Sequence, residues 1–422
     1  MKGQALMALG KQDEAVKLLN QATLLAPEEA EPWLALAKMQ AETGDEQRSM
    51  DTMKAAVLAV PDSAEVNFSL GKAFIRGGLF SDGLPFLRKA AVLAPESVEV
   101  TLDLGRTLVA LGHHEEARRV LEQGRQRWPS HAALAHAYAE TALLFNEREA
   151  ALKALDTALQ GGNVPLAWYM LDAQTLTQFE ADGTRPEPDP GRLVTAQLGL
   201  EKGIVENPDC FEARLLRAEI LIARHEYAQA YDSLQNMIES GANLSGLNWR
   251  LQAGLGEAGL RLEKMESALV ALKDAIQERP DNPRLQRLLA ETYHLGKLEP
   301  EAKIAAREAL KLSPDGLEML EWFAGFAAKL GEPDEAIRAL RTATQLSPEG
   351  AGYWISLAEM QLRQDDRSEA VKALETTLGL SGLTVEHLRR IARAHLVLGQ
   401  PEVALDCLQR AVKNGSATDA EL

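Results

Sequence analysis

The residues best suited to chemistry in this 422-residue chain are a pair of adjacent histidines and several pairs of carboxylates. His113 and His114 follow one another, so their imidazoles do not share one helix face as two zinc ligands would. The pairs Glu115-Glu116 and Asp365-Asp366 fall at predicted helix starts, where the helix dipole favours negative charge. These spacings predict neither a metal site nor a catalytic pair.

Motifs of the common catalytic and nucleotide-binding folds are absent from the sequence. It contains no GxxxxGK[ST] phosphate loop, no GxSxG nucleophile elbow and no HExxH zinc motif. Cys210 and Cys407 lie far apart and form no CxxC, so we expect two small core residues. We therefore predict that the chain is not an enzyme and binds no cofactor or metal.

The charge and hydropathy of the chain exclude two classes of partner. The formal net charge of −17 opposes the phosphate backbone, so we expect no nucleic-acid binding. No segment approaches the about 20 apolar residues that span a bilayer, so we expect no membrane insertion. The start, MKGQALMALGKQDEA, has no signal peptide, which predicts a cytoplasmic protein, or a periplasmic one if a signal sequence lies in a longer parent.

Prolines recur every 34 residues, at 27, 61, 95 and 129 and again at 280, 314 and 348. Small and large residues recur at fixed offsets from them, among them Trp33, Leu36, Ala37, Gly44, Leu70, Gly71, Phe74, Leu104, Gly105, Leu108, Gly112, Ala117 and Leu121. The pattern resembles the tetratricopeptide repeat, W-x2-L-G-x2-Y, then A-x3-F, then P. The resemblance implies an all-α, right-handed solenoid of helical hairpins whose first helices line a concave groove.

The physics of one copy explains its residue types. Leu104 and Leu108 lie on one apolar stripe of the first predicted helix, and Gly105 lets the second helix approach it. Gly112 ends the first helix by accepting a left-handed backbone, and Pro129 ends the second because it cannot continue the hydrogen-bond ladder. Such a hairpin has two apolar faces, so neighbouring copies must stack to bury them.

Carried along the chain, the repeat predicts eleven hairpins after an incomplete first copy, as one continuous array. The hairpins occupy 30–63, 64–97, 98–131, 132–163, 164–210, 211–248, 249–282, 283–316, 317–350, 351–384 and 385–415. Three regions are distinguished: N-terminal repeats over 1–163, an irregular repeat over 164–210 and C-terminal repeats over 211–422.

An insertion makes the 164–210 repeat irregular. From Pro129 to Pro208 is 79 residues, which is two 34-residue repeats plus 11, and the excess falls in ADGTRPEPDPGR at 181–192. Asp189 followed by Pro190 predicts the start of the second helix, because Asp caps helices and proline fits their first turn. The preceding prolines predict a stiff, extended loop, so Arg185, Glu187 and Asp189 are candidate contacts for a partner.

The resemblance implies that the ninth residue of each first helix faces the groove. Three consecutive basic residues there form a basic row: Lys38, Lys72 and Arg106. Five consecutive acidic residues follow as an acidic row: Glu140, Asp172, Glu219, Glu257 and Glu291. One hypothesis is a bipolar groove that orients a peptide of opposite polarity. The alternative is that these charges pair with neighbouring hairpins, which is worth about 0–1 kcal/mol for each exposed pair.

Charge also sets the middle of the chain apart. Residues 164–248 carry 6 basic and 13 acidic side chains, a net charge of −7. An acidic face that keeps the array soluble and a docking surface for a basic partner both account for it.

The resemblance excludes two known groove chemistries. The sixth residue of the first helix is never Asn, which argues against the clamp for terminal carboxylates and against the asparagine ladder of glycosyltransferase-linked arrays. The six tryptophans are expected in core packing rather than in an aromatic track. The chain is predicted to be a non-catalytic scaffold or adaptor that binds a protein or peptide in its groove. The alternative is a regulatory or substrate-recruiting arm of a larger multidomain enzyme, or of an envelope or exopolysaccharide secretion assembly.

Overall fold

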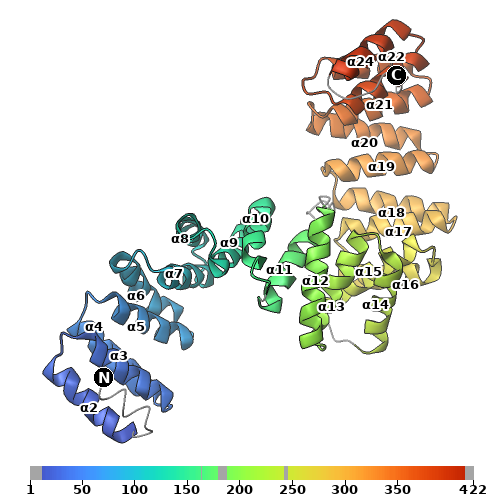
Figure 1. Ribbon diagram of the computed structural model, residues 1–422. Coiled ribbons are helices and arrows are strands. Elements are labelled where there is room, and N and C mark those ends of the chain that lie inside the picture. Colours follow the sequence, from blue (N-terminus) through green and yellow to red (C-terminus); the bar gives the residue numbers. More distant parts are fainter. Residues whose placement is uncertain (1–11, 163, 179–187, 242–245, 414–422) are drawn as a thin grey trace. The chain divides into compact units, whose positions relative to one another are not determined.

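The computed structural model describes residues 12–162, 164–178, 188–241 and 246–413 of the chain. Over these ranges the protein contains twenty-three α-helices and no β-strand (Figure 1). It divides into two compact bodies, an N-terminal body of Met1–Thr175 and a C-terminal body of Leu176–Leu422. The all-α prediction is therefore confirmed. The predicted continuity of the array across the boundary stays a prediction.

The helices follow one another with short turns. Those that begin in the N-terminal body are α2 (Gln12–Leu25), α3 (Ala30–Glu42), α4 (Glu46–Ala59), α5 (Ala64–Arg76), α6 (Phe80–Leu93), α7 (Val98–Ala110), α8 (His114–Arg127), α9 (Ala132–Leu144), α10 (Arg148–Leu159) and α11 (Leu166–Thr177).

The C-terminal body continues the same succession. Its helices are α12 (Pro190–Glu206), α13 (Phe211–Ala223), α14 (Tyr227–Glu239), α15 (Asn248–Arg261), α16 (Met265–Glu278), α17 (Pro283–Leu295), α18 (Glu299–Leu312), α19 (Leu317–Lys329), α20 (Pro333–Leu346), α21 (Ala351–Arg363), α22 (Arg367–Leu378), α23 (Val385–Val397) and α24 (Pro401–Lys413).

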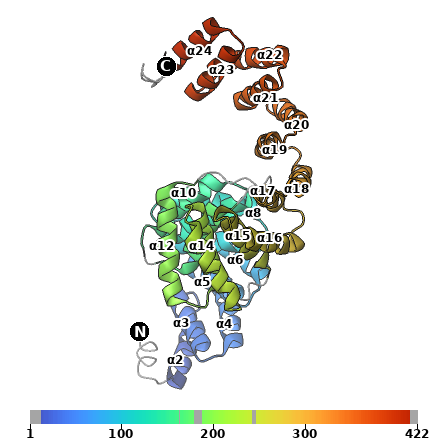
Figure 2. The same ribbon diagram turned by 90° about the vertical axis from the view of Figure 1, so that its right-hand side faces the viewer.

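Within each body the helices pair into predicted hairpins, from α3–α4 to α9–α10 in the N-terminal body and from α13–α14 to α23–α24 in the C-terminal body, with α2 as the second helix of the incomplete first copy. Helices in extensive contact are sequence neighbours or one helix apart, as in a solenoid in which each repeat buries its faces against the next. Figure 1 shows α17, α18, α19 and α20 of the C-terminal body lying one above another, and Figure 2 shows the same order from the side. The α-solenoid class predicted from the repeat is confirmed.

Close helix contact within a hairpin depends on glycine. A Cβ added to Gly105 on α7 would lie 2.5 Å from Cδ2 of Leu121 on α8, which is shorter than any carbon–carbon contact. Leu121 is fully buried at this crossing. The predicted role of Gly105 is thus confirmed, and it explains why a small residue recurs at the eighth position of most copies.

The turn between the two helices has the same backbone in nearly every hairpin. Gly112 has φ 75°, which confirms the predicted left-handed end of α7. The equivalent residues of other hairpins adopt this conformation without glycine, as at Glu263 with φ 57° and Lys297 with φ 60°. Stacking of the hairpins therefore holds a backbone conformation that these side chains disfavour.

The helix start predicted after the insertion is confirmed. Helix α12 begins at Pro190, and the Asp189 carboxylate accepts a hydrogen bond of 2.8 Å from the backbone N–H of Arg192. Helix α11 ends at Thr177 rather than running to the insertion. Arg185 and Glu187 lie outside the described residues.

Candidate protein-binding groove

The basic and acidic rows lie at one register of the fold. Each member is on the first helix of its hairpin: Lys38 on α3, Lys72 on α5, Arg106 on α7, Glu140 on α9, Asp172 on α11, Glu219 on α13, Glu257 on α15 and Glu291 on α17. Stacked hairpins place equivalent residues of successive first helices on one wall. The two rows nevertheless differ in their exposure and their partners.

The basic row is exposed in the N-terminal body. The side chains of Lys38 and Lys72 are 73% and 47% exposed, and Arg106 is exposed as well. Lys38 Nζ lies 4.0 Å from the carboxylate of Glu42, and Lys72 Nζ lies 3.8 Å from that of Asp103 on the next hairpin. Pairs this long and this exposed hold their charges weakly, so the cations remain available to a ligand.

The Asp103 carboxyl lies near Lys72 of the basic row, but the cations of the row do not lower its pKa below the ordinary value. Burial raises the pKa of its carboxyl above the ordinary value of 3.8, against the opposing effect of Lys72 and Arg106. The neighbouring cations thus do not offset the loss of hydration at Asp103.

Two residues of the acidic row lie where the N-terminal body ends. Glu140 on α9 is half exposed, and its carboxylate lies 3.4 Å from Nδ1 of the buried His136. The His136 ring stacks on Trp168 of α11 with centroids 4.6 Å apart. Asp172 is only 1% exposed, so a partner in the groove cannot contact it directly. Neither this burial nor the histidine–tryptophan stack was predicted from the residues of the repeat.

Glu219 and Glu257 of the acidic row are each bound by an arginine from the following hairpin. The Glu219 carboxylate accepts hydrogen bonds of 2.9 Å and 2.5 Å from two nitrogens of Arg250 on α15. Both side chains are mostly buried, at 18% and 16% exposure. One repeat later, Arg284 on α17 donates a hydrogen bond to the Glu257 carboxylate. Both arginines lie in the first turn of their helix. The pairing left open by the sequence is present at these carboxylates.

Glu291 has a denser set of partners. Its carboxylate accepts a 2.9 Å hydrogen bond from the indole N–H of Trp322 on the next hairpin. Arg261 and Arg287 each lie 3.2 Å from it. Further along, Arg390 on α23 binds Glu359 on α21 through two hydrogen bonds of 3.0 Å and 2.8 Å. The acidic wall of the C-terminal body is therefore largely neutralised by its own arginines.

The electrostatics of these clamps follow from their burial. Burial acts to lower the pKa of Arg250, but the Glu219 carboxylate outweighs it and holds the pKa above its ordinary value. At Arg390 the hydrogen bonds to Glu359 are the largest effect and also raise the pKa. The raised pKa values keep Arg250 and Arg390 protonated beside their carboxylates at neutral pH.

The tryptophans serve mainly to close the stack, although none of the six is fully buried. The indole N–H of Trp33 donates to the carbonyl of Pro27 at 3.0 Å, and that of Trp354 donates to the carbonyl of Pro348 at 2.9 Å. Both indoles also pack against buried core clusters. Trp128, Trp249 and Trp322 also pack against core clusters, as expected. Trp322 donates in addition to Glu291, and Trp168 stacks on His136.

The part of the chain that the structure describes contains no group of three or more His, Cys, Asp or Glu side chains that could hold a metal ion. None of the described helices is long and apolar enough to cross a bilayer.

Comparison with known proteins gives consistent matches to one repeat family. Two family models of the tetratricopeptide repeat match the chain, one over residues 1–39 and 98–141 and the other over 254–316, 327–382 and 361–419. No curated protein matches the sequence.

Similar solved structures include yeast Tom70, at 16% identity over 98% of both chains and a TM-score of 0.47. The human IFIT1 dimer with PPP-AAAA is similar at 16% identity over 95% of this chain and 94% of that one, with a TM-score of 0.46. The APC/C hetero-tetramer Cut9-Hcn1 is similar at 13% identity over 99% and 87%, with a TM-score of 0.43.

Proposed function

Because the chain belongs to the tetratricopeptide repeat family and is a protein-interaction scaffold, we propose that it binds an acidic segment of a partner protein along the basic row of its N-terminal body. The exposure of Lys38, Lys72 and Arg106 at one register of three successive hairpins carries the proposal. An extended acidic peptide can place its carboxylates against such a row.

The acidic row has a different part in this proposal. Its carboxylates at Glu219, Glu257 and Glu291 are 15–18% exposed and are bound by arginines. They stabilise the contacts between hairpins of the C-terminal body rather than receive a basic ligand. The scaffold is non-catalytic in this proposal, and its specificity comes from the charge pattern of the N-terminal body.

A charge-reversal experiment tests the proposal. A fluorescein-labelled oligoglutamate peptide is titrated with the wild-type chain and with the triple variant Lys38→Glu, Lys72→Glu, Arg106→Glu. Fluorescence anisotropy should show affinity weakened by at least about tenfold, because three favourable charges become repulsive. Wild-type binding should also weaken as salt is added.

The matched control reverses three exposed cations on the second helices of the same hairpins, Arg48, Lys89 and Arg119. It changes the net charge equally and should retain most of the affinity. Thermal melting of both triple variants should match that of the wild type. Equal affinity of the two variants for the peptide would refute a specific basic row.

A further inference from the structure

The hairpin α13–α14 departs from the repeat at a position that is otherwise buried and apolar. The seventh residue of the first helix is buried in most hairpins, as Leu36, Leu70, Leu104, Leu255, Leu289 and Phe323. In α13 this residue is Arg217, whose side chain is 28% exposed. An arginine there cannot fill the space that leucine fills against the preceding second helix.

A second arginine stands at the fourth position of α13, where some other copies have a residue that hydrogen-bonds to the preceding loop. The fourth residue of the first helix donates to the carbonyl of the preceding repeat's proline in three copies, through Trp33, Asn67 and Trp354. In α13 this residue is Arg214, which instead lies over the Phe211 ring, 5.6 Å from its centroid. In α13 a residue that is apolar and buried in most hairpins and one that closes the junction in three copies are thus both arginines.

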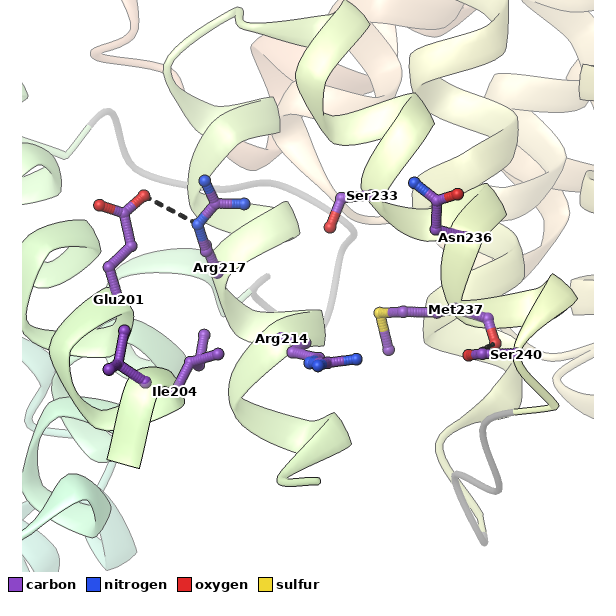
Figure 3. Close-up of a pocket in the computed structure, with 9 residues that line it drawn as sticks. Glu201, Ile204, Arg214, Arg217, Ser233, Asn236, Met237 and Ser240 are labelled. Atoms are coloured by element: carbon purple, nitrogen blue, oxygen red, sulfur yellow. Dashed lines mark hydrogen bonds and ion pairs between the residues drawn. The ribbon is translucent and has the colours of Figure 1, made fainter. Parts of the chain in front are cut away.

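A pocket of about 540 Å³ lies at this junction, bordered by α12, α13 and α14 (Figure 3). Its volume is within the range of small-ligand sites. In Figure 3 Arg214 lies between Ile204 of α12 on one side and Met237 of α14 on the other. Val205 adds an aliphatic side chain that is 82% exposed. No residue of the basic or acidic row lines the pocket.

The charges that line the pocket do not cancel. Arg217 donates a 2.8 Å hydrogen bond to Glu201 of α12. Burial acts to raise the pKa of Glu201, but the hydrogen bonds from Gln197 and Arg217 hold it below the ordinary value, so this pair is ionic. Among the described residues, the Arg214 guanidinium has neither a hydrogen bond nor an ion pair. The pocket therefore holds one uncompensated positive charge beside aliphatic walls.

Neutral polar groups complete the lining. Ser240 donates its hydroxyl to the Met237 carbonyl at 2.9 Å. The Asn236 amide and the Ser233 hydroxyl have no hydrogen-bond partner among the described side chains and backbone. A ligand carboxylate could pair with Arg214, and an aliphatic group could pack against the apolar wall. A peptide amide of the same ligand could hydrogen-bond to Asn236.

We propose that this pocket binds the C-terminal end of a partner peptide, with an aliphatic last side chain against Ile204 and Met237 and the terminal carboxylate on Arg214. The proposal is independent of the basic row, because it uses another surface in the other body. A charge-assisted hydrogen bond from arginine to a carboxylate supplies both affinity and orientation.

The test follows the methyl group of Met237 by NMR in protein labelled with ¹³C-methyl methionine. The sequence contains 10 methionines, and the variant Met237→Leu assigns the signal. N-acetyl-leucyl-leucine with a free carboxylate is the probe, and its C-terminal amide is the comparison ligand. The carboxylate should shift the Met237 signal saturably, and both the amide and Arg214→Gln should weaken binding by about tenfold or more.

Two further variants make the result decisive. Arg341→Gln removes one exposed guanidinium of α20 away from the pocket and should leave the affinity unchanged. Arg214→Trp restores the side chain that closes other junctions and should abolish the shift while the protein still melts cooperatively. A Met237 signal that the carboxylate does not shift, or equal affinity for the amide or for Arg214→Gln, would overturn the proposal.

Discussion

In both bodies the ninth residue of the first helix is mostly a charged side chain, but its exposure and its partners differ between the bodies. In the N-terminal body Lys38 and Lys72 extend into solvent and make only long contacts. In the C-terminal body Glu219 and Glu257 are 18% and 15% exposed and are held by an arginine of the next hairpin. One repeat position thus carries exposed cations in one body and mostly buried, arginine-bound carboxylates in the other.

Burial explains this difference. A charge that leaves water must be paired and hydrogen-bonded, and arginine meets a carboxylate with two parallel N–H donors. Lysine offers a single flexible ammonium that stays hydrated, and an exposed pair of that kind contributes little to stability. The comparison therefore predicts different effects for substitutions at equivalent positions.

The largest effect should come from breaking a buried clamp. Arg250→Met leaves the mostly buried Glu219 without its main partner and should lower the free energy of unfolding of the C-terminal body by about 3 kcal/mol. Lys72→Met in the N-terminal body should cost less than about 1 kcal/mol. Urea denaturation followed by circular dichroism measures both. Equal losses would show that the bodies do not differ as described.

A smaller effect, equal in both bodies, should follow from filling the helix crossings. A Cβ at Gly105 would lie 2.5 Å from Leu121, and a Cβ at Gly256 would lie 2.5 Å from Leu272. Each glycine-to-alanine change should therefore cost about 1–3 kcal/mol. Gly325→Ala is the control, since a Cβ there meets nothing within 4 Å and alanine favours the helix. A large difference between the Gly105 and Gly256 variants would mean that the bodies differ in packing as well as in charge.

The smallest effect concerns pH and the basic row. The pKa of Asp103 is raised by burial, so ionising this carboxyl costs the folded state more than the unfolded chain. Asp103→Asn should therefore slightly raise the melting temperature at neutral pH. The gain should shrink as the pH falls through the raised pKa of the folded state, and it should be absent well below the ordinary value of 3.8, where the carboxyl is protonated in both states. Melting curves across this range check the sign, and a loss of stability at neutral pH would contradict it.

Much of the fold follows from residues that the sequence shows directly. The 34-residue spacing predicted the hairpins. Gly112 predicted the left-handed turn at the end of α7, and Asp189 predicted the start of α12. These features depend on local backbone preference and on periodic apolar faces, which reside in short stretches of chain. The left-handed turn at Lys297 was not predictable in this way, because stacking imposes it on a residue that does not favour it.

The sites were less accessible to sequence reasoning. The acidic row was identified residue by residue, but its arginine partners were not, and the burial of Asp172 and the stack of His136 on Trp168 gave no periodic signal. The pocket did leave a trace in the sequence. Arg214 and Arg217 stand at the fourth and seventh positions of their copy, where a residue-by-residue comparison of the repeats would have marked them.

The sequence by itself determined that this chain forms stacked helical hairpins and which residue of each first helix occupies the ninth position, because both depend on spacing along the chain. Only the tertiary structure decided whether that residue is free or bound. Arg250, which binds Glu219, and Trp322, which donates to Glu291, each lie about one repeat away, on the next hairpin. Packing between hairpins sets their burial, and burial decides whether a charge must be paired or can stay hydrated.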